Sequence, residues 1–279
     1  ETWSVREAAA AAAMELGEAL PPQTRDEAVL GAVHALLDDK VRWVRAAACE
    51  QFCKLLALAS AAHITPVRLA SYTALADVAA TTRRGDSAAR RWCAYAMPGV
   101  LQALGPRRFC ELQDAYVALC DDLQWDTRLT LAASLPVVAR IVLPANPSFA
   151  GKAVRLLGAF LRDLEEIRLA SLRNLALLMP AVPPRHALRV LRWMPHLARD
   201  ENWRVRRRVA KLHGELAQYC SDHKQQLAHL QTQQHKGHKK NKKKKGEEPV
   251  ETGLFVRMGM QLCDDPVWAV RQAAVAAVP

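Results

Sequence analysis

The chain has 279 residues, of which 51% are hydrophobic and only 6% are aromatic, and its formal net charge is +11. Frequent alanine with few glycines and prolines favours closely packed helices over β-sheet. The sequence has neither a long apolar run nor a basic leader, so we expect no membrane span and no secretory signal. Its seven cysteines lack the spacing of a disulfide framework and indicate buried thiols in a reducing compartment.

The chain opens with the first copy of a short motif, Trp3-Ser4-Val5-Arg6. A complete copy has an acidic residue, a gap that often holds Trp, then a β-branched residue and Arg at the head of a helix-forming segment. The first copy lacks its acidic residue. Because the start, Glu1-Thr2-Trp3, also lacks Met and basic residues, we interpret residue 1 as a cut or processed end inside a longer array. The later copies are Asp39…Trp43-Val44-Arg45, a weaker Asp86…Arg90-Arg91, Asp122…Trp125-Asp126-Thr127-Arg128, Asp163…Ile167-Arg168, Asp200…Trp203-Arg204-Val205-Arg206 and Asp265…Trp268-Ala269-Val270-Arg271.

The copies recur at a nearly constant interval. Aligned on the arginines, the spacings run from 37 to 46 residues, apart from a last interval of 65. That interval falls to 37 when a 28-residue lysine-rich insert is set aside. A period near 40 is typical of HEAT and armadillo repeats, which are pairs of helices. The aligned arginines stand at 6, 45, 91, 128, 168, 206 and 271.

The segments on either side of each motif predict the two helices of one repeat. After each Arg, apolar or small residues at offsets −1, +3 and +10 lie on one stripe of a helix, which we call helix B. An amphipathic segment before each acidic residue predicts a preceding helix, helix A, and proline begins several of these segments. The helix A segments are roughly 25–37, 66–82, 106–120, 147–162, 184–198 and 250–263.

These patterns predict an all-α fold, a right-handed α-solenoid of HEAT repeats. One helix pair cannot bury both of its faces, so stability would come from stacking neighbouring pairs. We expect HEAT repeats over 1–221, with a partial first repeat at 1–20 and about five helix pairs. A disordered lysine-rich insert would follow at 222–249, and a further, truncated repeat at 250–279.

The acidic residue and the arginine of the motif predict a structural Asp/Arg ladder. The Asp precedes helix B and can accept backbone N–H groups at its N-terminus, where negative charge is favourable. The Arg can reach the Asp of an adjacent repeat with its forked guanidinium. The predicted ladder residues are Asp39, Arg45, Asp122, Arg128, Asp163, Arg168, Asp200, Arg206, Asp265 and Arg271.

With these turns in view, the sequence resembles HEAT-repeat proteins, and in particular the scaffold (A, or 65 kDa regulatory) subunit of protein phosphatase 2A. The resemblance rests on the stretches 200–206 and 264–271 and on Pro195 near the end of a helix A. It implies a curved array whose turns between helices A and B form a ridge that engages a catalytic and a regulatory subunit. The lysine-rich insert, the degenerate turn near Arg91 and the smaller number of repeats depart from that family.

Carried over to this chain, the ridge would present tryptophan and charged side chains to a partner. Trp and Arg are frequent anchors of protein interfaces. The alternative interpretation is that each Trp covers the core beneath its own turn. The candidate partner-binding residues are Arg42, Trp43, Trp125, Asp126, Trp203, Arg204 and Trp268.

The lysine-rich insert holds eight Lys against three acidic residues, a net charge of +5, which leaves +6 for the rest of the chain. Three interpretations remain: a solvated loop, a nuclear-localisation element, or a phosphate-binding segment. No aromatic residues interleave the lysines, which argues against nucleic-acid base stacking. The candidate nuclear-localisation residues are Lys239, Lys240, Lys242, Lys243, Lys244 and Lys245.

No residue set for catalysis, metal binding or a cofactor is visible. Cys220 and the nearby His residues fit no common zinc spacing, and phosphate-binding and nucleophile motifs are absent. The leading hypothesis is therefore a non-catalytic scaffold that holds a Ser/Thr phosphatase catalytic subunit and a regulatory subunit, with the cytoplasm as its expected compartment and the nucleus as a second one. A nuclear-transport or other cargo adaptor is the alternative, and a nucleic-acid-binding HEAT protein, including HEAT-like DNA glycosylases, is the third.

Overall fold

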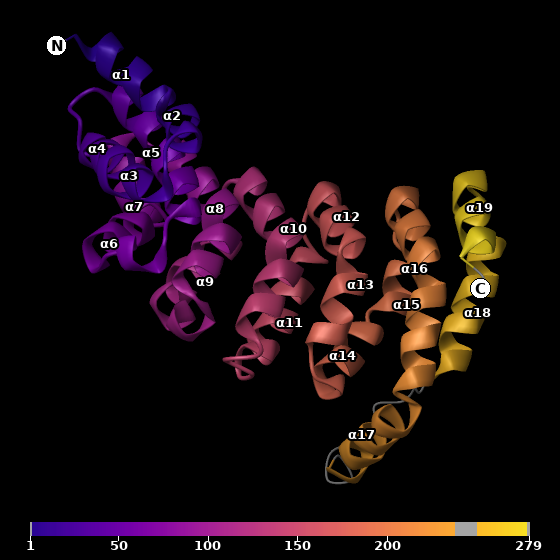
Figure 1. The fold of residues 1–279 in the computed structure, drawn as a ribbon. Helices are drawn as coiled ribbons and strands as arrows, with labels where there is room; N and C mark the ends of the chain where they lie inside the picture. The colour runs from indigo at the N-terminus through magenta and orange to yellow at the C-terminus, as the bar shows by residue number, and fades with distance from the viewer. Residues whose placement is uncertain (1, 238–249, 278–279) are drawn as a thin grey trace. The chain divides into compact units, whose positions relative to one another are not determined.

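The computed structural model describes residues 2–237 and 250–277, and within those residues it contains helices and turns but no strand. Two compact units are present: unit 1 is Glu1–Pro147 and unit 2 is Ser148–Pro279. Helix pairs follow one another along each unit (Figure 1). The predicted all-α repeat fold is confirmed, whereas the sequence indicated one continuous array up to residue 221 and no boundary near residue 147.

The B helices of unit 1 pack side by side in chain order. Helix α1 contacts α5, α5 contacts α8, and α8 contacts α10. The A helices pack outside them and are shorter, and several begin at a proline that suits the first turn of a helix. The B helices are α1 (Trp3–Ala11) with α2 (Ala13–Ala19), α5 (Arg42–Leu58), α8 (Ala88–Leu104) and α10 (Trp125–Val142). The A segments are α3 (Pro22–Thr24), a π-helical turn (Arg25–Val29) and α4 (Leu30–Leu36); a 3-10 turn (Ala61–His63) and α6 (Pro66–Ala74); and a 3-10 turn (Pro106–Glu111) and α9 (Gln113–Cys120).

An additional short helix, α7 (Val78–Arg84), separates α6 from α8. Asp77 caps its N-terminus by accepting the Ala80 N–H at 2.8 Å, and Gly85 ends it with a φ of 71°, a conformation that favours glycine. The sequence predicted one helix over 66–82 at this place. The inserted helix explains both the long spacing of this repeat and its degenerate turn.

The predicted apolar stripe lies in the core for the helices B that follow the first copy, whereas in the first copy Val5 and Leu16 are 55% and 54% exposed. Val44 and Thr127 precede the motif arginines and are fully buried, as is Leu55 further along α5. Small residues allow close helix contacts: a Cβ atom on Gly99 of α8 would lie 2.7 Å from the Cβ of Ala57 on α5. Helices α5 and α8 can therefore approach closely only because residue 99 has no side chain.

Unit 2 repeats the same arrangement around a long helix, α16 (Trp203–Asp222), which packs against α12, α18 and α19. The packing is again close, because a Cβ atom on Gly259 of α18 would lie 2.6 Å from the ring of His213 on α16. The other B segments are α12 (Glu165–Arg173) with α13 (Leu175–Leu178) and a 3-10 turn (Met179–Ala181), and α19 (Trp268–Ala276). The A helices are α11 (Phe149–Phe160), α14 (Pro184–Leu191) with α15 (Met194–Leu197), and α18 (Thr252–Cys263).

The chain continues as a helix where the sequence predicted the start of a disordered insert. Residues Lys224–Gly237 form α17, in which Leu227 is buried, and just before it the His223 ring stacks on Tyr219 at a centroid distance of 4.2 Å. The Gln231 amide bonds both the N–H and the carbonyl of Val250, at 2.8 and 3.0 Å. The prediction of disorder from residue 222 is therefore wrong for residues 224–237, and residues 238–249 lie outside the described part of the chain.

Candidate partner-binding ridge

We call the row of turns that precede the B helices the ridge, and describe it for each unit separately. In unit 2 the turns before α12, α16 and α19 lie at the same end of their helices (Figure 1). Each turn carries the acidic residue of the repeated motif, and the arginine follows in the first turns of helix B. The ridge thus combines the predicted Asp/Arg ladder with the predicted partner-binding residues.

In unit 1 the arginine of one repeat binds the aspartate of the next through two hydrogen bonds. Arg6 donates to both carboxylate oxygens of Asp39, at 2.7 and 3.1 Å. Arg45 does the same to Asp86, at 2.9 and 3.2 Å. Such forked pairing fixes orientation as well as distance, so it sets the register between neighbouring helices B. The hydrogen bonds from Arg6 also hold the pKa of Asp39 below its ordinary value.

The third ion pair of unit 1 involves Arg90 and not Arg91, the residue that the sequence alignment placed in register. Arg90 donates to Asp122 at 2.6 Å and to the Thr81 hydroxyl at 2.6 Å. The side chains of Arg90 and Asp122 are 2% and 0% exposed, so this is the most buried ion pair described in unit 1. Arg91 instead reaches Asp126 at 3.3 Å on the surface.

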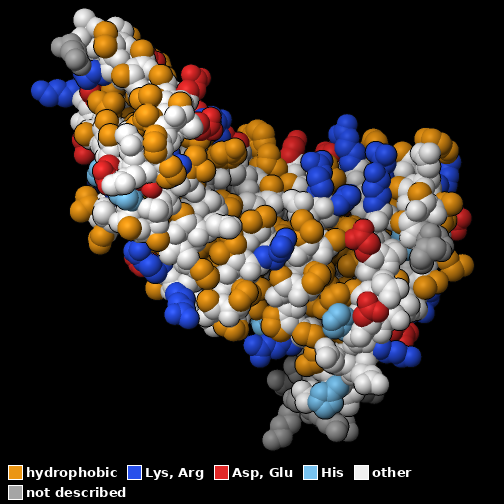
Figure 2. All heavy atoms as spheres, viewed as in Figure 1, with side chains coloured by type: hydrophobic (Ala, Val, Ile, Leu, Met, Phe, Trp, Pro, Cys, Tyr) orange, Lys and Arg blue, Asp and Glu red, His pale blue; other side chains and the backbone are white. Residues whose placement is uncertain are grey.

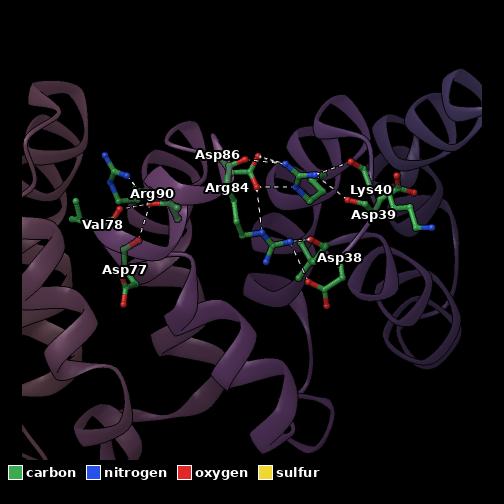
Figure 3. Close-up of polar contacts among 11 residues, drawn as sticks. Asp38, Asp39, Lys40, Asp77, Val78, Arg84, Asp86 and Arg90 are labelled. Carbon is green, nitrogen blue, oxygen red and sulfur yellow. Dashed lines mark hydrogen bonds and ion pairs between the residues drawn. The ribbon is translucent and has the colours of Figure 1, made fainter.

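The short helix α7 supplies additional partners to this part of the ladder. Arg84, in its last turn, donates to the Leu37 carbonyl at 2.7 Å and to the Asp38 carboxylate at 3.1 Å. Its own carbonyl accepts a hydrogen bond from Arg45 at 2.9 Å. Figure 3 shows Arg84 and Asp86 facing the preceding turn, which holds Asp38 and Asp39. The degenerate repeat is thus joined to its neighbour by more contacts than the regular ones.

Unit 2 contains one weak and one strong ion pair of the same kind. Arg168 reaches Asp200 through a single bond of 3.4 Å. Arg206 binds Asp265 through two bonds of 2.7 and 3.0 Å, which lower the pKa of Asp265 and raise that of Arg206. The second pair joins residues 59 positions apart, so α16 and α19 are neighbours although α17 and the insert lie between them in sequence.

The ladder aspartates order their own turns and do not cap the helices directly. Asp39, for example, accepts the N–H of Val41, which is itself the residue before the first helical position of α5. The carboxylate thereby closes an Asx-type turn. Asp122, Asp200 and Asp265 bond the residue two positions on, at 2.8, 2.9 and 2.9 Å, and Asp163 bonds Leu164 at 2.7 Å.

The arginines complete the turns from the other side by donating to the carbonyls that the turn leaves exposed. Arg45 donates to the carbonyls of Asp39 and Lys40, at 3.0 and 3.2 Å. One guanidinium thus ties its own turn and the next repeat together. The same bond to the Asp carbonyl of the turn is made by Arg128, Arg168, Arg206 and Arg271, at 2.7, 2.9, 2.9 and 2.7 Å.

The tryptophans of the unit 1 ridge are exposed at the first turns of their helices. Trp43 is 60% exposed and Trp125 is 48% exposed, and the Arg42 guanidinium lies 5.6 Å from the Trp43 ring centroid. Leu123, in the turn before α10, is 82% exposed. Large apolar side chains concentrated on a row of ordered turns are typical of a protein-binding surface. Trp43 and Trp125 therefore do not fit the alternative that each Trp only covers its own core.

Trp43 also borders a hollow that no sequence motif predicts. The hollow has a volume of about 360 Å³ and lies among the first turns of α1, α5 and α8, with Glu7, Trp43, Gly85 and Trp92 in its lining. Trp92 is half-buried and lies within cation–π range of Lys54 and Arg91. The motif register did not single out Trp92, because the adjacent turn is the degenerate one.

The predicted residues of the unit 2 ridge differ in exposure. Trp268 is exposed, whereas Trp203 is half-buried with the Arg204 guanidinium 5.6 Å from its ring centroid. Arg204 is exposed and also contacts Glu165 at 3.1 Å. For Trp203, the interpretation as a partial cover of its own turn therefore fits the geometry better than for the other ridge tryptophans.

The described residues offer neither a metal centre nor a membrane-spanning helix. No group of three or more His, Cys, Asp or Glu side chains in residues 2–237 and 250–277 could hold a metal ion. No helix among those residues is long and apolar enough to cross a bilayer. The candidate nuclear-localisation residues Lys239, Lys240 and Lys242–Lys245 lie outside the described residues.

Comparison with known proteins connects part of the chain to a phosphatase regulatory protein. A scan against protein-family models finds no match. A stretch of 90 residues, 32% of the chain, is 36% identical to serine/threonine-protein phosphatase 4 regulatory subunit 1 of Homo sapiens, and equally to those of Mus musculus and Rattus norvegicus. The match spans only 9% of the length of these relatives. It supports the broad class of phosphatase regulatory proteins, which are not the catalytic subunits, but not the 2A scaffold specifically.

Proposed function

We propose that this chain belongs to a non-catalytic regulatory protein that holds the catalytic subunit of a Ser/Thr phosphatase, of the phosphatase 4 type, against its ridge. The partial similarity to phosphatase 4 regulatory subunit 1 supports the class of partner. The observation that carries the proposal is the row of exposed tryptophans on the turns of unit 1.

The unit 1 ridge suits this role because its apolar side chains stand on ordered turns. Trp43 and Trp125 head helices whose register is set by the Arg45–Asp86 and Arg90–Asp122 ion pairs. Holding the anchors in place before binding reduces the entropy that association would otherwise cost. The hollow beside Trp43 and Trp92 provides a recess for a side chain of the partner.

The mechanism would be geometric, since no catalytic residue set is visible in the sequence. A scaffold of this kind raises the effective concentration of a bound substrate near the catalytic subunit. The catalytic chemistry would belong entirely to the bound subunit. A further regulatory or substrate-selecting partner would occupy a different part of the same array.

A binding assay with purified catalytic subunits tests the proposal. The chain is immobilised and its capture of the catalytic subunit of phosphatase 4 is compared with that of phosphatase 2A. We expect capture of the phosphatase 4 subunit, and we expect the double variant Trp43→Ala/Trp125→Ala to weaken it at least tenfold, because ridge anchors dominate interface energies. Val67→Ala, on the exposed face of α6, is the matched control and should bind like wild type.

Three outcomes would contradict the proposal in different ways. Capture of neither catalytic subunit would overturn the phosphatase assignment. Equal losses in the ridge variant and the control would overturn the role of the ridge. Preferential capture of the phosphatase 2A subunit would support a Ser/Thr phosphatase partner but contradict the phosphatase 4 type. Thermal unfolding of each variant checks that the tryptophan substitutions leave the fold intact.

The cellular location is a separate proposal. We infer the cytoplasm as the main compartment, since the cysteines of the chain are free thiols in the structure. A tagged chain viewed in cells, with and without substitution of Lys239, Lys240 and Lys242–Lys245, tests whether those lysines direct nuclear import. An equal distribution of both versions would remove the nuclear-localisation interpretation.

A further inference from the structure

Unit 2 has a groove along α16 that the ridge does not include. Its volume is about 500 Å³, and its walls come from α13 and the 3-10 turn after it, from α16, and from Ala277, which follows α19. Ala176, Met179 and Pro180 line one side, while Leu212 and Tyr219 of α16 form the floor. The lining is mostly apolar, and Glu215 and Asp222 are its acidic members.

The same face of α16 is strongly cationic at the end nearest the ridge. Arg204, Arg207, Arg208 and Lys211 are spaced three or four residues apart, so they share one face of the helix, and Arg173 of α12 lies beside Arg208. Figure 2 shows Lys and Arg side chains gathering over this end of α12 and α16. The face continues through Glu215 and Tyr219 into the apolar groove.

The positive charge of this end is poorly compensated by carboxylates. Arg204 contacts Glu165, but among the described residues no ion pair involves Arg173, Arg207, Arg208 or Lys211. Arg208 donates instead to the carbonyls of Leu172 and Arg173 at the end of α12, at 3.4 and 2.6 Å, and the carboxylate of Glu215 interacts with it only through space, without a direct ion pair. The Nε atom of Arg207 is buried without a hydrogen-bond partner in the described residues.

We propose that this groove binds a short segment of a partner protein that has acidic residues at one end and apolar residues at the other. The acidic end would lie on the cationic part of α16, and the apolar end would fill the space between Met179, Pro180 and Tyr219. Charge complementarity fixes the direction of the segment, and burial of apolar side chains supplies affinity. The groove lies in unit 2, so this proposal goes beyond the catalytic-subunit contact proposed for unit 1.

A protein segment fits this surface better than a nucleic acid does. A nucleic acid would extend along a stripe of phosphate contacts, and bases would need exposed aromatic platforms. Here the cationic part occupies only the first two turns of α16, and Trp203 beside it is half-buried. The groove that follows is apolar and includes the acidic residues Glu215 and Asp222, which would repel a second run of phosphates.

Fluorescence anisotropy with the full chain tests the proposal. The probe is a fluorescein-labelled peptide with a block of Asp and Glu followed by a block of Leu and Ala. The variant Arg173→Glu/Lys211→Glu should weaken binding roughly tenfold, because it reverses two exposed charges that face the acidic block. The control, Arg155→Glu/Arg185→Glu, makes the same charge change on the A helices α11 and α14 of unit 2 and should stay within about twofold of wild type.

Changing one end of the probe peptide at a time distinguishes the contribution of charge from that of apolar burial. A peptide with Ser in place of Leu and Ala should bind more weakly but with about the same dependence on salt, because the charged contacts remain and only the apolar ones are lost. Lack of binding by the original peptide, or equal losses in the variant and the control, would overturn the proposal. Tighter binding of a single-stranded RNA oligonucleotide, lost in the same variant, would overturn it in favour of nucleic acid. Catalytic-subunit capture by unit 1 is measured separately, so either proposal can fail alone.

Discussion

The two units use the same backbone turn to present different surfaces. In unit 1 the ridge exposes Trp43 and Trp125, and its ion pairs include the buried Arg90–Asp122 contact. In unit 2 Trp268 is exposed as well, but Trp203 is half-buried, the surface beside it is cationic with Arg204 and Lys211 exposed, and one of the ion pairs is a single 3.4 Å contact. The Asp and Arg of the turn set the register of the helices, and the residues between them are therefore free to define what each unit can bind.

The buried ion pair of unit 1 should give the largest effect on stability. Arg90→Ala leaves Asp122 as an uncompensated buried charge, so the free energy of unfolding should fall by roughly 3–5 kcal/mol. Arg91→Ala, one residue away and half exposed, should cost less than about 1 kcal/mol. Urea denaturation followed by circular dichroism measures both. Equal losses of stability in the two variants would contradict the assignment of the ladder contact to Arg90.

The exposed tryptophans should affect binding more than folding. Trp43→Ala should reduce the affinity for the catalytic subunit by about 2 kcal/mol, or about thirtyfold in Kd, with little change in thermal stability. Trp203→Ala should lower the thermal stability and leave the affinity for the catalytic subunit nearly unchanged, because this ring is half-buried at the start of α16. Titration calorimetry and thermal unfolding of both variants compare the two units directly. Similar losses of affinity and of thermal stability in both variants would contradict the expected difference between Trp43 and Trp203.

Within unit 2 the two ion pairs should differ in strength. Arg206→Ala removes a forked, largely buried contact to Asp265 and should cost about 1–3 kcal/mol. Arg168→Ala removes one longer contact to Asp200 and should cost less than about 1 kcal/mol. Urea denaturation of the two single variants provides the measurement. A larger loss of unfolding free energy in Arg168→Ala than in Arg206→Ala would show that hydrogen-bond length and burial do not predict the relative strength of the two ion pairs.

The smallest expected effect is a dependence on acidic pH. Hydrogen bonds from Arg206 hold the pKa of Asp265 below its ordinary value of 3.8. A carboxyl group with a lowered pKa in the folded state stabilises the fold above 3.8, and that contribution is lost as the pH falls through the folded value. Stability measured at about pH 5 and about pH 3 should therefore fall less in Arg206→Ala than in wild type. An identical fall in stability in both proteins would show that Asp265 does not contribute to the loss of stability at acidic pH.

Much of the fold was predictable because the repeat imposes the same burial at most copies, the first being an exception since Val5 is exposed. Val44, Ile167, Val205 and Val270 precede the motif arginines, and all are fully buried. The pattern failed where the backbone departs from the repeat. The turn after helix α7 is shorter, with Arg90 four residues after Asp86 where Arg45 is six after Asp39, so alignment on Arg91 selected a surface residue in place of the buried Arg90.

The candidate site was less predictable, because exposure depends on neighbours that a motif does not specify. Trp43 and Trp203 occupy equivalent turns, yet only Trp43 is largely exposed. The cationic face of α16 could be read in the stretch 204–211, but its continuation into an apolar groove needs α13 beside it. Composition likewise suggested disorder after residue 221, whereas Leu227 is buried and helps to anchor α17.

The two hydrogen bonds between Arg206 and Asp265 hold α16 beside α19 whatever sequence lies between them. The two residues are 59 positions apart, and the double hydrogen bond of Gln231 to Val250 closes a smaller ring within that span. Gln231 of α17 and Val250 before α18 are therefore held together by their own hydrogen bonds. A reporter domain that joins the chain between Gln231 and Val250 would therefore meet two attachment points that these contacts already hold close together, which lowers the entropy cost of closing the added loop.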